Sequence, residues 1–167
     1  KFDQAVPLAQ RLCKLYEEQF GAEDPQTLAM ENNLAVLLEE GGLLEQAETQ
    51  YRSSLQKRLE VLGSGHPDTA MSYNSLANLL FRRSKFDEAK EFGRKAYELR
   101  DELLGPASPA TLTSMHNLLM MHLITEDVEP ARQLLERGIP YMEDTFGEDH
   151  PMTQAWKESL QRLPPKS

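Results

Sequence analysis

The stretch GSGHPDTA at residues 63–70 decides the fold, because close variants of it recur along the chain. The variants are GAEDPQT at 21–27, GPASPAT at 105–111 and GEDHPMT at 147–153. Glycine, proline and threonine keep their places in all four, and every series steps by 42 residues without insertion or deletion, as in Pro25, Pro67, Pro109 and Pro151. The same step links Ala5, Ala47, Ala89 and Ala131, and also Leu34, Leu76, Leu118 and Leu160. A fixed period of this length indicates stacked structural repeats.

The segments between these phrases have a helical pattern. Apolar residues follow three- and four-residue steps before Gly41 and Gly42, and again after them. Gly63 is expected to end the second helix in a left-handed conformation, and Pro67 suits the first turn of the next helix. Before the prolines, Asp24 and Ser108 are good N-caps, whereas His66 and His150 are poorer ones.

Each unit is therefore predicted to be an antiparallel hairpin of helix A, which starts at the proline, and helix B, which ends at the glycine. One hairpin cannot bury its apolar faces alone, so neighbours must stack into an all-α solenoid. The expected single domain, 1–167, divides into helix B of a truncated repeat (1–24), complete repeats at 25–66, 67–108 and 109–150, and a terminal helix A (151–167). The chain lacks a starting Met and opens inside a helical pattern, which suggests a piece of a longer protein.

Composition narrows the choice of partner and compartment. The net charge of −9 disfavours binding to nucleic-acid phosphates. No apolar run approaches the roughly 20 residues that cross a bilayer, so no membrane span is expected. The single cysteine, Cys13, excludes an internal disulfide framework and fits a reducing, cytoplasmic compartment.

No catalytic constellation is evident. His116 and His122 are six residues apart, whereas helical metal ligands are three or four apart. The chain has no GxxxxGK[ST] or GxGxxG phosphate loop, and no spacing pairs two carboxylates. Cys13 is expected in the core, matched by Leu55, Tyr97 and Ile139 in the other repeats. We therefore expect that the protein is not an enzyme and that it binds neither a cofactor nor a metal ion.

The third repeat departs from the others. Gly138 and Pro140 lie in the middle of its helix B, where a proline costs roughly 3 kcal/mol, so we expect a kink or break near Gly138. Trp156, the only tryptophan, is expected to seal the end of the stack against this helix; the alternative is that it anchors a partner.

The repeats resemble tetratricopeptide repeats, and their longer period resembles that of kinesin light chains. The resemblance is carried by GSGHPDT and GEDHPMT, and by MENNLAVLLEEGGLLEQAE (30–48) and SYNSLANLLFRRSKFDEAK (72–90). It covers essentially the whole chain and implies a right-handed superhelix whose concave face is lined by helix A and binds extended peptides or helices. The two-lysine clamp of chaperone-binding repeats is not present, so no binding to a C-terminal carboxylate is expected.

Mapping the family's groove positions implies a set of partner-binding residues: Asn32, Asn33, Asn74, Asn78, Arg82, His116 and Asn117. Val36, Ser75, Phe81, Met120, Glu158 and Arg162 also fall on groove positions. Ser75 and His116 replace asparagines of the family. An amide both donates and accepts, so a row of amides can hold a peptide backbone. For the asparagines the alternative is helix surface or an inter-helix hydrogen bond, and for Arg82 it is solvated charge; Glu39 and Glu40 are expected to be solvated surface.

The predicted function is non-catalytic recognition: a scaffold or adaptor that binds a protein or peptide along its concave groove. The alternative is a structural spacer or self-association module within a larger assembly. This alternative depends on the first helix, which is expected to expose an apolar face that pairs with a copy of itself to form a homo-oligomer.

Overall fold

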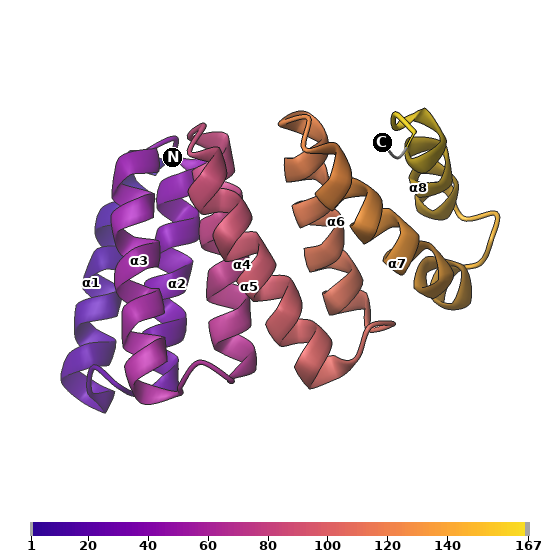
Figure 1. The fold of residues 1–167 in the computed structure, drawn as a ribbon. Helices are drawn as coiled ribbons and strands as arrows, with labels where there is room; N and C mark the ends of the chain where they lie inside the picture. Colours follow the sequence, from indigo (N-terminus) through magenta and orange to yellow (C-terminus); the bar gives the residue numbers. More distant parts are fainter. Residues whose placement is uncertain (1, 166–167) are drawn as a thin grey trace.

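The computed structural model describes residues 2–165 and, within them, eight helices and no strand (Figure 1). The helices are α1 (Phe2–Phe20), α2 (Pro25–Glu40), α3 (Leu44–Val61), α4 (Pro67–Arg82), α5 (Phe86–Leu104), α6 (Pro109–Ile124), α7 (Val128–Phe146) and α8 (Pro151–Arg162). The even-numbered helices are the predicted A helices, and each starts at the proline of a repeated phrase. The predicted all-α solenoid is confirmed.

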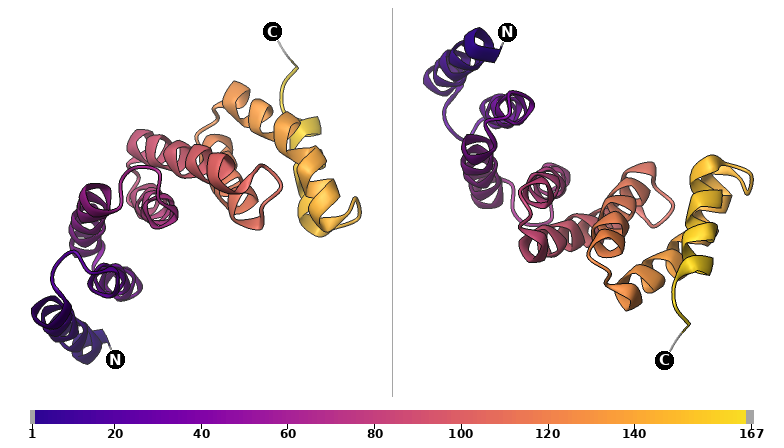
Figure 2. Two further views of the ribbon diagram at one scale, coloured as in Figure 1. Left: turned by 90° about the horizontal axis from the view of Figure 1, so that it is seen from below. Right: turned by 90° about the horizontal axis from the view of Figure 1, so that it is seen from above.

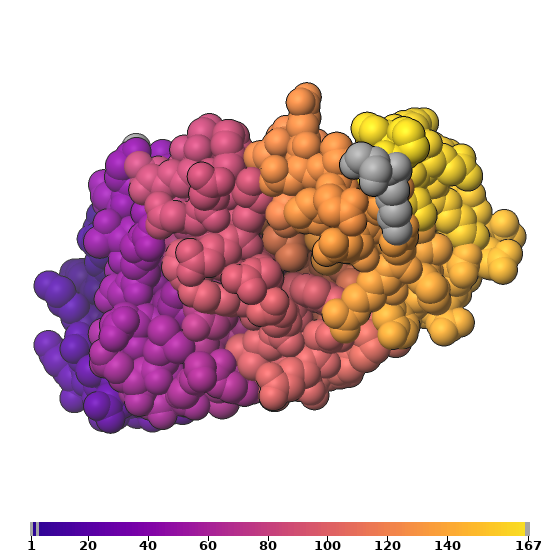
Figure 3. Space-filling model, in the orientation of Figure 1, coloured from indigo at the N-terminus to yellow at the C-terminus, as the bar shows by residue number. Residues whose placement is uncertain are grey.

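The hairpins follow one another along an arc. Each helix packs against its neighbours in the chain, and α4 also contacts α6. In the two views of Figure 2, α2, α4 and α6 line the inner side of the arc, and α3, α5 and α7 lie outside. Figure 3 shows the outer face, on which the hairpins succeed one another in chain order. The inner side of the arc is therefore lined by A helices.

Three of the four residues that precede the prolines cap an A helix with their side chains. Asp24 accepts a hydrogen bond from the backbone N–H of Gln26 at 2.8 Å. His66 and His150 do the same through Nδ1, at 3.1 and 3.2 Å. Ser108 makes no side-chain cap bond. Asp24 is thus the good cap that was expected, whereas Ser108 is not, and the two histidines make the cap bond that Ser108 lacks.

The glycines that end the B helices have positive φ, between 81° and 95°. Gly105 and Gly147 combine it with ψ of 164° and 156°, which is an extended region open almost only to glycine and not the predicted left-handed helical one. The turn inside each hairpin also requires positive φ. Gly42 provides it in the first repeat, whereas Ser84 and Glu126 adopt φ of 60° and 59° at the equivalent positions.

The repeated threonine ties three of the four A helices to the segment before them, whereas the buried hydroxyl of Thr27 in α2 has no hydrogen-bond partner among the described residues. The hydroxyl groups of Thr69, Thr111 and Thr153 donate to the backbone carbonyls of Gly63, Arg100 and Met142, at 2.8, 3.0 and 3.4 Å. All three threonines are fully buried, so these hydrogen bonds give each buried hydroxyl group a partner on the preceding B helix or the turn that follows it.

Each B helix contacts the next A helix at a joint, and the residues at equivalent positions of these joints differ in polarity along the stack. Arg58 donates to the hydroxyl of Ser72 at 2.7 Å, and Arg100 donates to Ser114 at the same distance. In the last joint the equivalent positions are occupied by Met142 and Trp156, which share one core cluster. A polar joint is thus replaced by an apolar one at the C-terminal end.

Of the kink or break predicted near Gly138, a break does not occur, because α7 is continuous from Val128 to Phe146. Gly138 is needed for space and does not interrupt the helix. A Cβ there would lie 2.3 Å from Cζ3 of Trp156 and 2.5 Å from Sδ of Met115. Pro140 is exposed, so its ring does not disturb the core. Trp156 is 2% exposed and fills the notch at Gly138, so it seals the joint as expected.

Candidate functional site

Two neighbouring pockets lie in the inner groove. The first, here the Met120 pocket, has a volume of about 210 Å³ and is lined by Asn78, Phe81, Arg82, Asn117, Met120 and Met121. The second, here the Glu39 pocket, has a volume of about 260 Å³ and is lined by Val36, Glu39, Glu40, Tyr51, Ser75, Asn78 and Arg82. Asn78 and Arg82 line both, so the two pockets form one continuous site along α2, α4 and α6.

Three of the predicted groove residues, Asn78, Arg82 and Asn117, come together in this site. Asn78 is half-buried and makes no side-chain hydrogen bond with any part of the chain that the structure describes. Its amide lies between the two pockets, with both its donors and its acceptor free for a ligand. Asn78 is therefore the best-placed amide for holding a peptide backbone.

Arg82 is bound to a residue of the neighbouring hairpin. Its guanidinium forms an ion pair with Glu39 of α2, and Glu39 also accepts a hydrogen bond from the hydroxyl of Tyr51 at 3.0 Å. Burial, and then the charge and hydrogen bond of Glu39, raise the pKa of Tyr51 well above its usual range. Glu39 is therefore held in place by Arg82 and Tyr51 and is not the solvated side chain expected from the sequence.

Asn74 and Asn117 bind each other across two A helices. The side-chain amide of Asn117 donates to Oδ1 of Asn74 at 3.2 Å, and the hydroxyl of Ser114 donates to the same oxygen at 3.4 Å. Asn74 lines neither pocket. Its geometry matches the inter-helix alternative, whereas Asn117 also reaches the Met120 pocket.

The remaining predicted residues lie outside the two pockets. Asn32 is buried and its Oδ1 has no hydrogen-bond partner. Asn33 is exposed on α2, and its one side-chain hydrogen bond within residues 2–165 is a long one, 4.0 Å, from Nδ2 to Sδ of Met30. The groove site is thus narrower than the family pattern implied and is centred on α4.

His116 lies under Trp156 at the C-terminal end. Nε1 of Trp156 donates to Nδ1 of His116 at 3.1 Å, and the two rings stack at 6.0 Å with an angle of 11°. Burial lowers the pKa of His116. Nδ1 must be unprotonated to accept this hydrogen bond, so His116 acts as a neutral part of the end seal.

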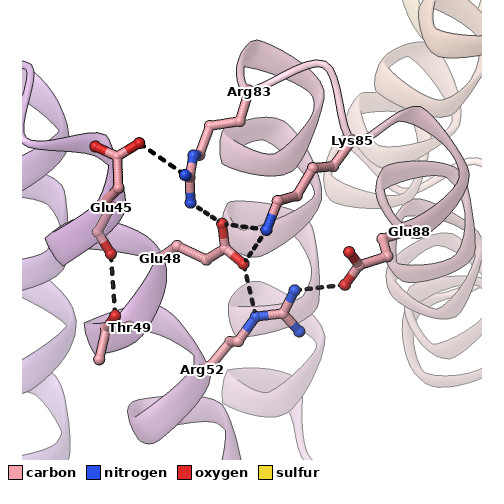
Figure 4. A network of polar contacts seen from close by, with 7 residues as sticks. All are labelled: Glu45, Glu48, Thr49, Arg52, Arg83, Lys85 and Glu88. Atoms are coloured by element: carbon pink, nitrogen blue, oxygen red, sulfur yellow. Dashed lines mark hydrogen bonds and ion pairs between the residues drawn. The ribbon is translucent and has the colours of Figure 1, made fainter.

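A polar network fastens the first two complete hairpins on their outer side (Figure 4). Glu48 of α3 is buried and binds Arg52 at 2.9 Å, Lys85 at 2.9 Å and the guanidinium of Arg83. Burial acts to raise the pKa of Glu48, but hydrogen bonds from Lys85 and Arg52 outweigh it and hold this pKa below its usual value. Arg83 therefore points away from the groove that its neighbour Arg82 lines.

The equivalent joint one repeat later has the opposite polarity. Lys90 occupies the position of Glu48, Asp127 occupies that of Lys85, and they form an ion pair at 2.6 Å. Hydrogen bonds from Lys90, His122 and Thr125 lower the pKa of Asp127 to about 2. The two joints therefore use the same pair of positions with the charges exchanged.

Other kinds of site have little support in the structure. Among residues 2–165, no group of three or more His, Cys, Asp or Glu side chains is arranged to hold a metal ion. Within the same range no helix has the length and apolarity that a bilayer span requires. Cys13 packs against the first core cluster, and burial raises the pKa of its thiol, so it is not an activated nucleophile.

Comparison with known proteins identifies the class. The model of the tetratricopeptide repeat family matches residues 26–102 and 68–144, which together cover more than half of the chain. The chain belongs to the tetratricopeptide repeat family, whose fold is typically a non-catalytic scaffold for protein–protein interaction. None of the curated proteins matches this sequence.

Solved structures define the subtype of the fold. Two crystal structures of kinesin light chain nearly identical TPR-like repeats from Podosopora anserina, one of them a point variant, are each 24% identical to this chain. Each has a TM-score of 0.84 and covers 96% of this chain and 76% of its own. BtubC (BKLC) from P. vanneervenii is 18% identical, with a TM-score of 0.78, over 99% of this chain and 77% of its own. The repeats are therefore of the kinesin light chain type in fold.

Proposed function

We propose that this domain is an adaptor that binds an extended segment of a partner protein along its inner groove, with Asn78, Arg82 and Asn117 in the binding surface. A cytoplasmic location, which the single free cysteine favours, is part of the proposal. The observation that carries it is the continuous site formed by the Met120 and Glu39 pockets, which share Asn78 and Arg82.

The chemistry of the site suits a peptide. The apolar lining of the Met120 pocket, which includes Phe81 and Met120, accommodates one side chain, and methionine adapts to different shapes. The free amide of Asn78 supplies hydrogen bonds to the peptide backbone between the pockets. A segment held in this way needs an apolar side chain that fits the Met120 pocket and a backbone that can bond to Asn78.

The test is selection of a random dodecapeptide display library on the domain, followed by titration of the enriched peptides against Asn78→Ala and Asn33→Ala. Loss of one or two hydrogen bonds should weaken binding to Asn78→Ala by about fivefold to tenfold. Asn33→Ala removes an amide from the same groove side but outside both pockets, so affinity should not change. Equal binding by Asn78→Ala with unchanged thermal unfolding would refute the groove assignment.

A second candidate function, self-association, is favoured by one observation. Leu8, Leu12 and Leu15 form an exposed stripe on α1, with exposed fractions of 61%, 44% and 55%. The position of Leu12 is taken by the buried Ala96 in α5 and by the buried Gly138 in α7. No A helix among the described residues covers this stripe of α1.

The two candidates can be separated by sedimentation equilibrium. If α1 pairs with α1 of a second copy, the domain forms a dimer that Leu12→Glu makes monomeric. The matched variant Leu104→Glu adds the same charge at an exposed leucine of α5 and should leave the dimer intact. A monomer at all concentrations would eliminate self-association and leave peptide recognition unaffected.

A further inference from the structure

The two pockets of the groove differ in charge, and the difference arises at one pair of helix positions. Near the ends of the three A helices, equivalent residues are Glu39 and Glu40 in α2, Phe81 and Arg82 in α4, and Leu123 and Ile124 in α6. The groove is thus acidic beside α2 and becomes apolar toward α6.

The acidic end keeps an uncompensated negative charge. Arg82 neutralises Glu39 through their ion pair, but Glu40 is exposed and has no ion-pair partner in residues 2–165. The C-terminal end of a helix carries a partial negative charge, and the last turn of α2 contains no basic residue. By contrast, α4 has Arg82 and α6 has His122 in that turn. The Glu39 pocket therefore favours a cation.

The apolar end lies directly beside it. Phe81, Met120 and Met121 line the Met120 pocket, and the only charged side chain there is that of Arg82, already bound to Glu39. Because Asn78 and Arg82 border both pockets, a single extended segment can occupy the two together. The overall charge of −9 also favours the approach of a basic segment.

We propose that the groove selects a partner segment that carries an apolar side chain for the Met120 pocket and, a few residues away, a lysine or arginine for the Glu39 pocket. This inference rests on the proposed function, since it names the chemistry of the ligand for the same site. The cation contacts Glu40 directly and competes with Arg82 for Glu39.

The test uses fluorescein-labelled synthetic peptides with a Gly/Ser background, one leucine and one arginine. The spacing between the leucine and the arginine varies from one to three serines, in both orders. Matched sets carry glutamate or glutamine in place of arginine. With one exposed ion pair gained, the arginine peptides should bind about fivefold more tightly than the glutamine set, with the advantage lost at high salt. The glutamate set should bind most weakly.

Variants locate the effect within the groove. Glu40→Gln should remove the preference for arginine over glutamine peptides and leave the affinity for the glutamine peptides unchanged. Glu102→Gln makes the same charge change on an exposed residue of α5, outside both pockets, and should have no effect. Arg82→Gln removes the ion-pair partner of Glu39, so the affinity for the arginine peptides should increase by a further few-fold. Met120→Ser should weaken all three sets, because each of them uses the Met120 pocket.

The outcomes separate this inference from the proposed function. Binding of the glutamate or glutamine peptides as tight as that of the arginine peptides, and dependent on Asn78 and Met120, would overturn the inference while the groove function stands. Retained arginine preference in Glu40→Gln would also overturn it. If no peptide from the sets or from the display selection binds in a manner that depends on Asn78 and Met120, both proposals fail.

Discussion

The indole of Trp156 packs against Gly138 so closely that a methyl group at position 138 would lie 2.3 Å from the ring. Gly138 belongs to the last B helix and Trp156 to the terminal A helix, and the missing side chain of one makes room for the large side chain of the other. The indole N–H then donates to His116 of α6. One glycine, one tryptophan and one histidine from three helices thus close the C-terminal end of the core.

Gly138→Ala should destabilise the domain, opposite to the usual effect of this substitution in a helix, where alanine gains roughly 0.5–1 kcal/mol. Overpacking against Trp156 and Met115 should reduce the free energy of unfolding by about 1–3 kcal/mol, measured by urea denaturation. Gly93→Ala in α5 is the matched control, because its nearest neighbours would be 3.4 Å away. A more stable Gly138→Ala protein would contradict the close packing.

The stability of the end seal should depend on pH through His116. Its pKa is lowered by burial in the folded domain, so below the ordinary histidine value of about 6.5 the unfolded chain binds the proton more readily. Stability should therefore fall as pH decreases from 7 towards 5, because the unfolded state gains protons in this window. Protonation also removes the acceptor that Trp156 uses.

The measurement is the free energy of unfolding at pH 7 and pH 5 for the wild type and His116→Asn. The asparagine cannot titrate, so the difference between the two pH values should be smaller in the variant. An identical pH dependence in both proteins would show that His116 is not responsible.

The exchanged charges of the two joints should be tested by a swap. Lys90→Glu places a carboxylate beside Asp127, and Asp127→Lys places an ammonium beside Lys90, so each single variant should be less stable than the wild type. The double variant restores an ion pair with the polarity of Glu48 and Lys85, and should recover most of the loss. A double-mutant cycle from urea denaturation gives the coupling energy. Additive losses would mean that the pair contributes nothing to the joint.

Arg58 should tolerate methionine better than alanine. Its side chain is 2% exposed, and its Nε has no hydrogen-bond partner, so its buried charge is incompletely satisfied. Burial lowers the pKa of Arg58 accordingly. Arg58→Ala leaves a cavity and should cost about 3 kcal/mol. Arg58→Met fills the space, as Met142 does in the last joint, and should cost clearly less; thermal unfolding of the two variants compares them.

Most of the architecture could be predicted from residue type and spacing. Glycine, proline and threonine recurring every 42 residues mark where helices stop and start, because these residues act on the backbone beside them. The helical periodicity and the alanines at Ala47, Ala89 and Ala131, all fully buried, follow from the same local rules. The hairpins, their order and their family could therefore be predicted from the sequence.

Contacts between side chains of different helices could not be predicted in this way. A kink or break was expected near Gly138 because the local cost of glycine and proline in a helix is visible in the sequence, whereas the tryptophan that needs the space is on another helix. Glu39 looked solvated because Tyr51 and Arg82 reach it only once the hairpins fold back and stack. Three of the five asparagines proposed for the groove are buried or bonded to another helix for the same reason: Asn32, Asn74 and Asn117.

The starts of the helices, and the glycines that follow the B helices, can be predicted from residue type and spacing, because capping, φ preference and amphipathic period act within one turn of the residue that carries them. Which side chains meet depends on how the helices pack: Trp156 with Gly138, Arg82 with Glu39, and Asn78 between two pockets. Those encounters depend on the angle and offset at which neighbouring helices pack, and that geometry is set by many side chains together.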